Sequence, residues 1–142
     1  PGLDPPPPGE RLRLREVRRA GTPPGDDAPT APETPAPPSP SVAPDPASPI
    51  VLLGDSHNLV FHAGGDMHAT GAGLPDQLAF ELGMAVDLVA VRGAASTAAR
   101  VNLLRRAQRD PAYWDGKRMV VWCFAAREFT EGDGWPVVPL RP

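Results

Sequence analysis

Proline is distributed very unevenly along this chain, and its distribution decides which part of the chain can fold. Of the 21 prolines in 142 residues, 16 lie within the first 49 residues. A stretch this rich in proline, alanine, serine and threonine has no periodic apolar face and cannot bury enough surface to offset the entropy of ordering. We therefore interpret residues 1–48 as a linker or disordered insertion and residues 49–142 as the folded domain.

One segment inside the proline-rich region has a different character. Residues 10–19 read ERLRLREVRR, and Leu12 and Leu14 alternate with arginines as they would on a short strand. The arginines suit an anionic partner, but a solvated strand or helix face is the simpler interpretation. Because the whole chain carries a net charge of −3, we expect no nucleic-acid partner.

The folded part alternates between short apolar runs and amphipathic stretches. Three runs have the length and β-branched content of buried strands: residues 50–53, 86–91 and 119–124. The first helical pattern between them has leucines at every fourth position and the stop signal Gly83. The second follows an N-cap at Ser96 or Thr97 and ends at Asp110-Pro111.

The order strand, helix, strand, helix, strand predicts how these elements are connected. Each crossover is long enough to make neighbouring strands parallel, with right-handed connections. The expected fold class is therefore α/β, a three-layer α/β/α doubly wound parallel sheet. Three strands are few for this fold, so we expect the sheet to be incomplete in this chain.

The residues best suited to chemistry follow the ends of the three strands. Gly54-Asp55-Ser56 follows the first strand, Gly93 follows the second and Arg127 follows the third. Open parallel sheets bind ligands beyond the carboxyl ends of their strands. Ser56 and Asp55 are the candidate catalytic residues, with Ser56 as the nucleophile. The amides of Ser56 and Gly93 form a candidate oxyanion hole.

Arg127 completes this candidate site. Its guanidinium would stabilise developing negative charge or bind an anionic substrate. Simpler interpretations exist for each residue. Gly-Asp-Ser is also ordinary turn and helix-cap chemistry, Gly93 also suits a plain turn, and Arg127 also suits a surface ion pair with Glu128 or Glu131.

A nucleophilic serine needs a general base, and the sequence offers only weak candidates. His57 is adjacent to Ser56, and adjacent side chains rarely face each other. Asp66-Met67-His68 places an aspartate next to a histidine in a glycine-rich loop, so His68 oriented by Asp66 is a candidate base. The same residues are also explained as polar loop groups facing water.

The sequence gives no sign of a cofactor. The spacing of its histidines and carboxylates matches no standard metal site. Its glycines form neither a dinucleotide-binding nor a phosphate-binding loop. We therefore expect no metal, nucleotide or other cofactor.

A family resemblance rests on four segments: VLLGDSHNLVF, GAGLPDQLAFELG, VDLVAVRGAA and KRMVVWCFAAREFTEGDGW. Together they resemble the SGNH-hydrolase-like domain of the alginate O-acetyltransferase AlgJ/AlgX-related family, over about residues 49–138. The resemblance implies an SGNH or flavodoxin-like fold and a serine acyl-enzyme that moves acetyl groups onto an exopolysaccharide. It also implies a periplasmic or extracytoplasmic location. In this comparison Ser56 is the nucleophile, and Arg127 matches the family's arginine after the third strand.

The chain departs from this family at the general base. The family places an Asp-x-His-Trp motif upstream of the serine strand, and residues 1–48 contain none. Since the chain begins at Pro1 rather than Met, we expect it to be a portion of a longer protein. The missing motif, or a membrane anchor, would then lie upstream of it.

Three hypotheses for the function follow. The leading one is an O-acyltransferase that acetylates a cell-envelope polysaccharide, with the acetyl donor supplied through a membrane acyltransferase partner. The second is a non-catalytic polysaccharide-binding or scaffold domain of the same fold. The third is a secreted carbohydrate esterase that uses His68 as its base.

Overall fold

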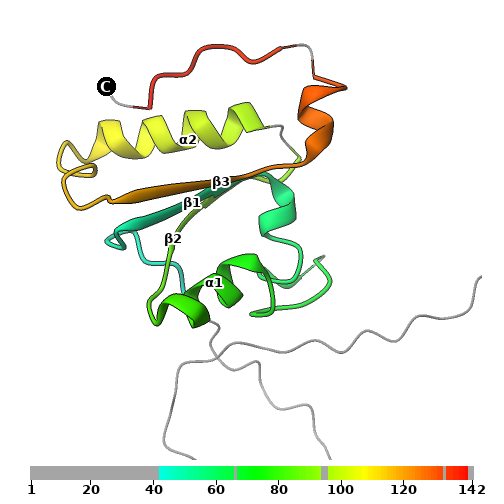
Figure 1. The fold of residues 1–142 in the computed structure, drawn as a ribbon, viewed down its shortest axis with the longest axis vertical. Coiled ribbons are helices and arrows are strands. Elements are labelled where there is room, and N and C mark those ends of the chain that lie inside the picture. Colours follow the sequence, from blue (N-terminus) through cyan, green and yellow to red (C-terminus); the bar gives the residue numbers. More distant parts are fainter. Residues whose placement is uncertain (1–41, 66, 94–95, 133, 141–142) are drawn as a thin grey trace, which may run out of the picture.

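The computed structural model describes residues 42–65, 67–93, 96–132 and 134–140 (Figure 1). Residues 10–19 and most of the proline-rich region lie outside the described residues. The described elements, in chain order, are β1 (Ile50–Gly54), η1 (Ser56–Asn58), α1 (Leu74–Leu82), β2 (Asp87–Ala90), α2 (Ser96–Arg109), β3 (Met119–Cys123) and η2 (Ala126–Phe129). The predicted α/β class, the three strands and the two helices are thereby confirmed.

Strand β1 is the centre of the sheet. The strand order is β2-β1-β3, and both pairings are parallel. Val51 aligns with Asp87 on one side and with Val120 on the other. The side chains of a strand point alternately to the two faces of its sheet, so a central strand buried on both faces has to be apolar throughout. The run Val51–Leu53 meets this requirement and is at most 1% exposed.

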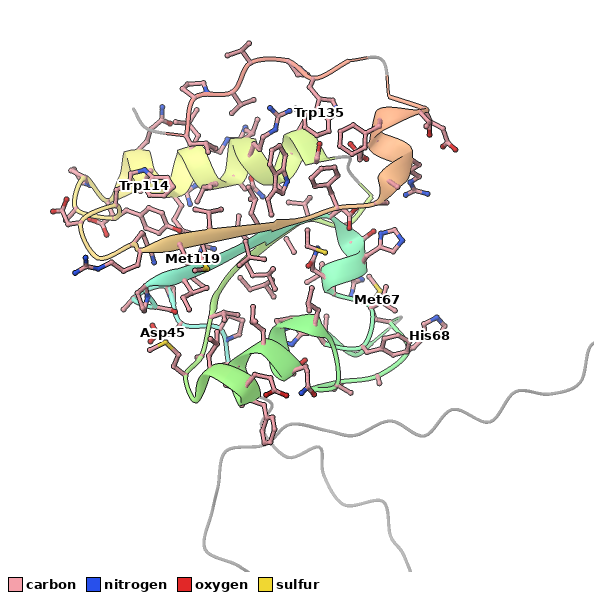
Figure 2. All side chains as sticks on the ribbon, viewed as in Figure 1. Asp45, Met67, His68, Trp114, Met119 and Trp135 are labelled. Carbon is pink, nitrogen blue, oxygen red and sulfur yellow. The ribbon has the colours of Figure 1, made fainter. Side chains whose placement is uncertain are left out.

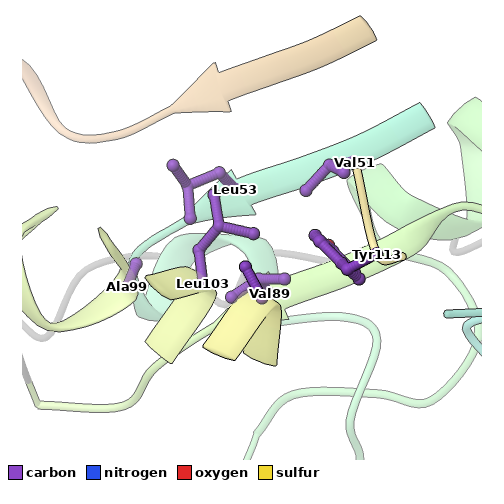
Figure 3. Packing of buried hydrophobic residues seen from close by; sticks show 7 residues of the cluster. Val51, Leu53, Val89, Ala99, Leu103 and Tyr113 are labelled. Carbon is purple, nitrogen blue, oxygen red and sulfur yellow. The ribbon is translucent and has the colours of Figure 1, made fainter. Parts of the chain in front are cut away.

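Helix α2 packs on one face of the sheet and forms the main hydrophobic core with it. The helix contributes small and branched side chains, and Tyr113 closes one end of the cluster (Figure 3). The core residues are Val51, Leu53, Val89, Ala99, Leu103, Ala107 and Tyr113. In Figure 1, α1 lies on the other side of the sheet. Because the three strands are parallel, their carboxyl ends all lie at one edge of the sheet.

A buried cluster of charged side chains lies at the amino ends of the strands, opposite their carboxyl ends. The Asp87 carboxylate accepts hydrogen bonds from the Tyr113 hydroxyl at 2.5 Å and from Lys117 Nζ at 2.9 Å, and it also pairs with Arg106. Lys117 Nζ donates a further hydrogen bond to the Ser48 carbonyl at 2.8 Å. The cluster therefore joins the segment before β1 to the amino ends of β2 and β3.

Helix α1 differs from the sequence pattern in the face that it buries. Its buried residues include Asp76 and Ala79, whereas Leu74 and Leu82 are 44% and 43% exposed. Asp76 Oδ2 lies 2.8 Å from Nδ1 of the buried His62 and accepts the Gly73 N–H at 2.9 Å. This polar pair lies on the inward side of the helix, whereas Leu74 and Leu82 lie on its exposed side.

The ends of the two helices agree only in part with the sequence signals. Gly83 ends α1 in a left-handed conformation with φ 66°, as predicted. Ser96 and Thr97 both lie inside α2, so neither is its N-cap; the Ser96 N–H donates to the Glu128 carboxylate, and its Oγ makes no capping hydrogen bond among the described residues. No helix among the described residues has both the length and the apolarity needed to cross a bilayer.

Candidate functional site

A cavity of about 320 Å³ opens at the carboxyl edge of the sheet. Its lining comes from three separate segments of the chain: Asp55, Ser56, Gly93, Arg127, Glu128, Glu131 and Gly132. The structure thus brings together the four residues that the sequence placed at this edge. It adds Glu128, Glu131 and Gly132, which sequence reasoning missed as site residues. The signal that points to them is their position directly after Arg127, in the same short segment.

Ser56 faces this cavity at the start of η1. It is half-buried, and its carbonyl accepts the Leu59 N–H at 2.9 Å. Among the described residues, no partner is hydrogen-bonded to the Ser56 hydroxyl or N–H. Gly93 lines the cavity in a left-handed conformation with φ 64°, which glycine adopts without strain. Ser56 and Gly93, from the ends of two neighbouring strands, thus lie together in the lining of one cavity.

Asp55 positions Ser56 rather than facing the cavity as a free carboxylate. The residue is 4% exposed, and its Oδ1 accepts the His57 N–H at 2.9 Å. Its Oδ2 accepts the Ala125 N–H at 2.9 Å. Asp55 therefore ties the end of β1 to the segment that leads into η2 and so fixes Ser56 relative to Arg127.

The ionisation of Asp55 follows from these contacts. Burial opposes the charged form, but the hydrogen bonds from Ala125 and His57 outweigh burial and lower the pKa of the carboxyl. The carboxylate is consequently ionised at neutral pH, and its role is to accept hydrogen bonds rather than to supply a proton.

Gly54 and Asn58 form a close contact beneath the serine that sequence reasoning did not detect. Asn58 is 1% exposed and donates hydrogen bonds from Nδ2 to the Asp55 carbonyl at 3.3 Å and to the Cys123 carbonyl at 3.1 Å. A Cβ atom at residue 54 would overlap both the Asn58 amide and the Cys123 carbonyl. Glycine at residue 54 therefore leaves room for the amide that links β1, η1 and β3.

Glu128 connects the cavity to helix α2. Its Oε2 accepts the Ser96 N–H at 3.0 Å, and its carbonyl accepts Trp135 Nε1 at 3.2 Å. Arg127, in contrast, forms no ion pair with Glu128 or Glu131 in the described part of the chain. Arg127 is an exposed residue of the cavity lining.

No histidine is among the described residues that line the cavity. His57 is 58% exposed at its side chain, and its Nδ1 lies 3.1 Å from Asp55 Oδ1. His62 is buried against Asp76, whereas His68 is exposed on the loop before α1 and stacks on Phe61 with ring centroids 5.5 Å apart (Figure 2).

Asp66, the residue predicted to orient His68, lies outside the described residues. Within the described ranges, no three histidine, cysteine, aspartate or glutamate side chains are grouped so that they could hold a metal ion. The described lining of the cavity thus contains a serine, two glycines, an arginine and three carboxylate residues, but no histidine.

Comparison of the chain with protein-family models, with curated proteins and with solved structures finds no match. The resemblance to the AlgJ/AlgX-related family therefore stays a prediction that rests on the four segments quoted above. The chemistry of the cavity is the remaining basis for a function.

Proposed function

We propose that this chain carries the nucleophile of a serine O-acyltransferase that moves acetyl groups onto a cell-envelope polysaccharide. One observation carries the proposal: Ser56, whose hydroxyl has no partner among the described residues, shares a cavity with Gly93 and Arg127. The sheet is then part of a larger three-layer, doubly wound SGNH-type domain. This combination fits acyl transfer better than phosphoryl or redox chemistry, because it supplies an oxygen nucleophile and donors for a developing oxyanion.

The reaction consists of two acyl transfers. Ser56 Oγ attacks the carbonyl carbon of the donor ester while a general base takes its proton. The Ser56 and Gly93 N–H groups bind the oxyanion of the tetrahedral intermediate, and Arg127 adds positive charge. The intermediate expels the donor alcohol, which regains a proton, and leaves acetyl-Ser56. A sugar hydroxyl then attacks this ester, loses its proton to the base and releases the free serine.

The general base comes from outside the described residues in this proposal. An upstream Asp-x-His motif, as the family resemblance implies, is the leading source. The working enzyme lies outside the cytoplasm, and a membrane acyltransferase partner presents the acetyl donor. His68 with Asp66 is the base only in the alternative of a secreted esterase.

The charges of the cavity bear on the acceptor. Asp55, Glu128 and Glu131 bring three carboxylates to the cavity against the single guanidinium of Arg127. Two of the carboxylates are engaged by backbone N–H groups, so Glu131 is the one left to face a ligand. The excess of three carboxylates over one guanidinium favours an uncharged sugar chain over a polyuronate as the acceptor.

A second candidate function is a non-catalytic polysaccharide-binding scaffold. The observation that favours it is the lack of any histidine among the described residues lining the cavity. The scaffold keeps the fold and the cleft but forms no acyl-serine, so the two functions differ in one measurable product.

Acetylation of Ser56 by an activated ester tests the proposal. The chain is incubated with 4-nitrophenyl acetate, and the peptide that contains Ser56 is examined by mass spectrometry, with Ser56→Ala as the control. An acetyl group on Ser56 that is discharged faster when a neutral oligosaccharide is added supports the transferase. A folded chain that gains no acetyl group on Ser56, even with imidazole added in place of the external base, supports the scaffold instead.

A further inference from the structure

A second cavity, separate from the one that contains Ser56, lies between strand β2 and helix α2. Its volume is about 240 Å³, and its described lining includes no carboxylate. The strand contributes residues 88–90, and the helix contributes Asn102, Arg105, Arg106 and Arg109. The chain as a whole has a net charge of −3, so a cavity lined by three arginines is a local concentration of positive charge.

The helix residues of this cavity form one side of α2. Counted from Asn102, they are spaced i, i+3, i+4 and i+7, which places them in a row along the helix. A different row of the same helix supplies the hydrophobic core: Ala99, Leu103 and Ala107. The row that lines the cavity is therefore polar throughout and presents an amide and three guanidinium groups.

Two of the three guanidinium groups have no counter-charge in the described part of the chain. Arg106 pairs with the Asp87 carboxylate, which also accepts a hydrogen bond from Lys117 Nζ. No described carboxylate pairs with the exposed Arg105 or Arg109. Like charges three or four residues apart on a helix repel each other, so an anion bound beside them relieves this repulsion.

Arg106 is the anchored member of the row. Its Nη1 pairs with Asp87, whose side chain is only 1% exposed, whereas the Arg106 side chain is 36% exposed. A guanidinium has five N–H donors, so this pairing leaves donors available to a ligand. A donor that is already held in place loses less conformational freedom when a ligand binds.

The size and the donors of the cavity indicate the class of ligand. Pockets for drug-sized molecules have volumes of about 300–1,000 Å³, so this smaller cavity suits a single anionic group. One arginine can bind both oxygens of a carboxylate in a bidentate pair. A phosphate monoester has a charge of about −1.5 to −2 and three strong acceptor oxygens, enough for several arginines. Three arginines beside one small cavity therefore favour a phosphate group.

The strand order keeps this cavity accessible. Among the described strands, β2 pairs only with β1 and lies at the edge of the sheet (Figure 1). In doubly wound sheets of the order 2-1-3-4-5, further strands are added beyond the third strand. A sheet that extends the order β2-β1-β3 in this way leaves β2 at its edge and the cavity open to a ligand.

We propose that the cavity between β2 and α2 is a binding site for a phosphate group, held by Arg105, Arg106 and Arg109. The phosphate belongs to a free phosphorylated molecule or to a lipid headgroup, since guanidinium groups recognise the same oxygens in both. The proposal does not depend on the acyltransferase function, because the two cavities share no described lining residue.

An NMR titration of the full chain with inorganic phosphate, at constant ionic strength, tests the site. We expect saturable shifts of the amide signals of residues 88–90 and 102–109. Arg105→Gln and Arg109→Gln should each weaken binding about tenfold, the effect of losing one charge-assisted hydrogen bond. Glutamine is a good helix former, so both variants should fold. The matched control Arg118→Gln removes an exposed arginine next to β3 and should bind phosphate within about twofold of the unaltered chain.

Two further measurements identify the ligand. Succinate, which carries two carboxylates, should bind at least about tenfold more weakly than phosphate. Sedimentation with phosphatidylcholine vesicles, with and without phosphatidic acid, separates the two sources of phosphate. Binding that requires phosphatidic acid and is lost in Arg109→Gln assigns the site to a lipid headgroup, whereas phosphate binding without sedimentation assigns it to a free phosphorylated molecule.

Three outcomes would overturn the proposal. One is the absence of saturable shifts at residues 88–90 and 102–109 in a folded chain. Another is an equal loss of binding in Arg118→Gln, because attraction to the surface in general would then explain the shifts. The third is succinate binding as tight as phosphate binding, which would contradict the assignment of the ligand class.

Discussion

Replacing Gly54 with alanine tests how tightly the serine is anchored. The added methyl group would approach the Asn58 amide nitrogen and the Cys123 carbonyl oxygen to less than 3.0 Å, so at least one group has to move. The carbonyl belongs to the backbone of β3, and the amide is buried. The amide is therefore the group that we expect to move, with loss of its hydrogen bonds to the Asp55 and Cys123 carbonyls.

The size of the effect follows from these losses. Each of the two hydrogen bonds contributes about 1 kcal/mol net. Overpacking in a closely packed core costs about 1–3 kcal/mol more. We therefore expect Gly54→Ala to lower the free energy of unfolding by about 3–5 kcal/mol, a large part of the stability of a small domain.

Urea unfolding, followed by tryptophan fluorescence, measures this difference. Gly116→Ala is the matched control, because no atom lies within 4 Å of a Cβ placed there, and we expect it to change stability by less than about 0.5 kcal/mol. The double variant Gly54→Ala/Asn58→Ala should recover only part of the loss, since the Cys123 carbonyl stays in the way. A Gly54→Ala chain as stable as the unaltered one would refute the reasoning.

Three further predictions concern pH and the candidate base. Burial and the hydrogen bond to Asp87 raise the pKa of Tyr113, so the free energy of unfolding should fall as the pH rises above about 10, and this fall should be smaller in Tyr113→Phe. Although burial opposes ionisation, the hydrogen bond from Ala125 helps to lower the pKa of Asp55. The stabilisation of the fold by the ionised Asp55 carboxyl should thus be complete above the ordinary pKa of 3.8 and be lost as the pH falls further. Urea unfolding at several pH values should show that the free energy of unfolding depends less on acid pH in Asp55→Asn than in the unaltered chain. His68→Ala should leave acetylation of Ser56 by 4-nitrophenyl acetate within twofold of the unaltered rate; its abolition would favour the esterase.

The strands and helices were predictable because their signals are local. The apolar run ending at Gly54 could only be a strand buried on both faces, and the structure places it at the centre of the sheet. Gly83 marked the end of α1, since a left-handed residue there favours glycine. The parallel pairing followed from the length of the two crossovers, without any knowledge of their conformation.

Which side of each helix or strand is buried was harder to predict, because it depends on residues far away in the sequence. The leucines of α1 are half-exposed since Asp76 turns toward His62, a pair that only the folded chain reveals. β3 has the composition of a central strand yet lies at an edge. The order of the strands is therefore not contained in their own sequences.

The candidate site shows the same division between local and distant signals. The positions after the strand ends identified Ser56, Gly93 and Arg127 as neighbours, because parallel strands end at one edge. The contribution of Glu131 to the cavity, and the Asn58 amide below Gly54, depend on the path of the chain after β3. The position of Glu131 shortly after Arg127 indicates the first, whereas no pattern within residues 54–58 predicts the second.

The central claim is that Ser56 is a nucleophile, and covalent labelling tests it most directly. The chain is treated with a serine-reactive fluorophosphonate and digested, and the labelled peptide is identified by mass spectrometry beside a Ser56→Ala control. The account predicts label on Ser56, and none at this peptide in the control. A chain shown to be folded by its protected β1 amides that acquires no label on Ser56, even with imidazole added in place of the external base, would contradict the claim.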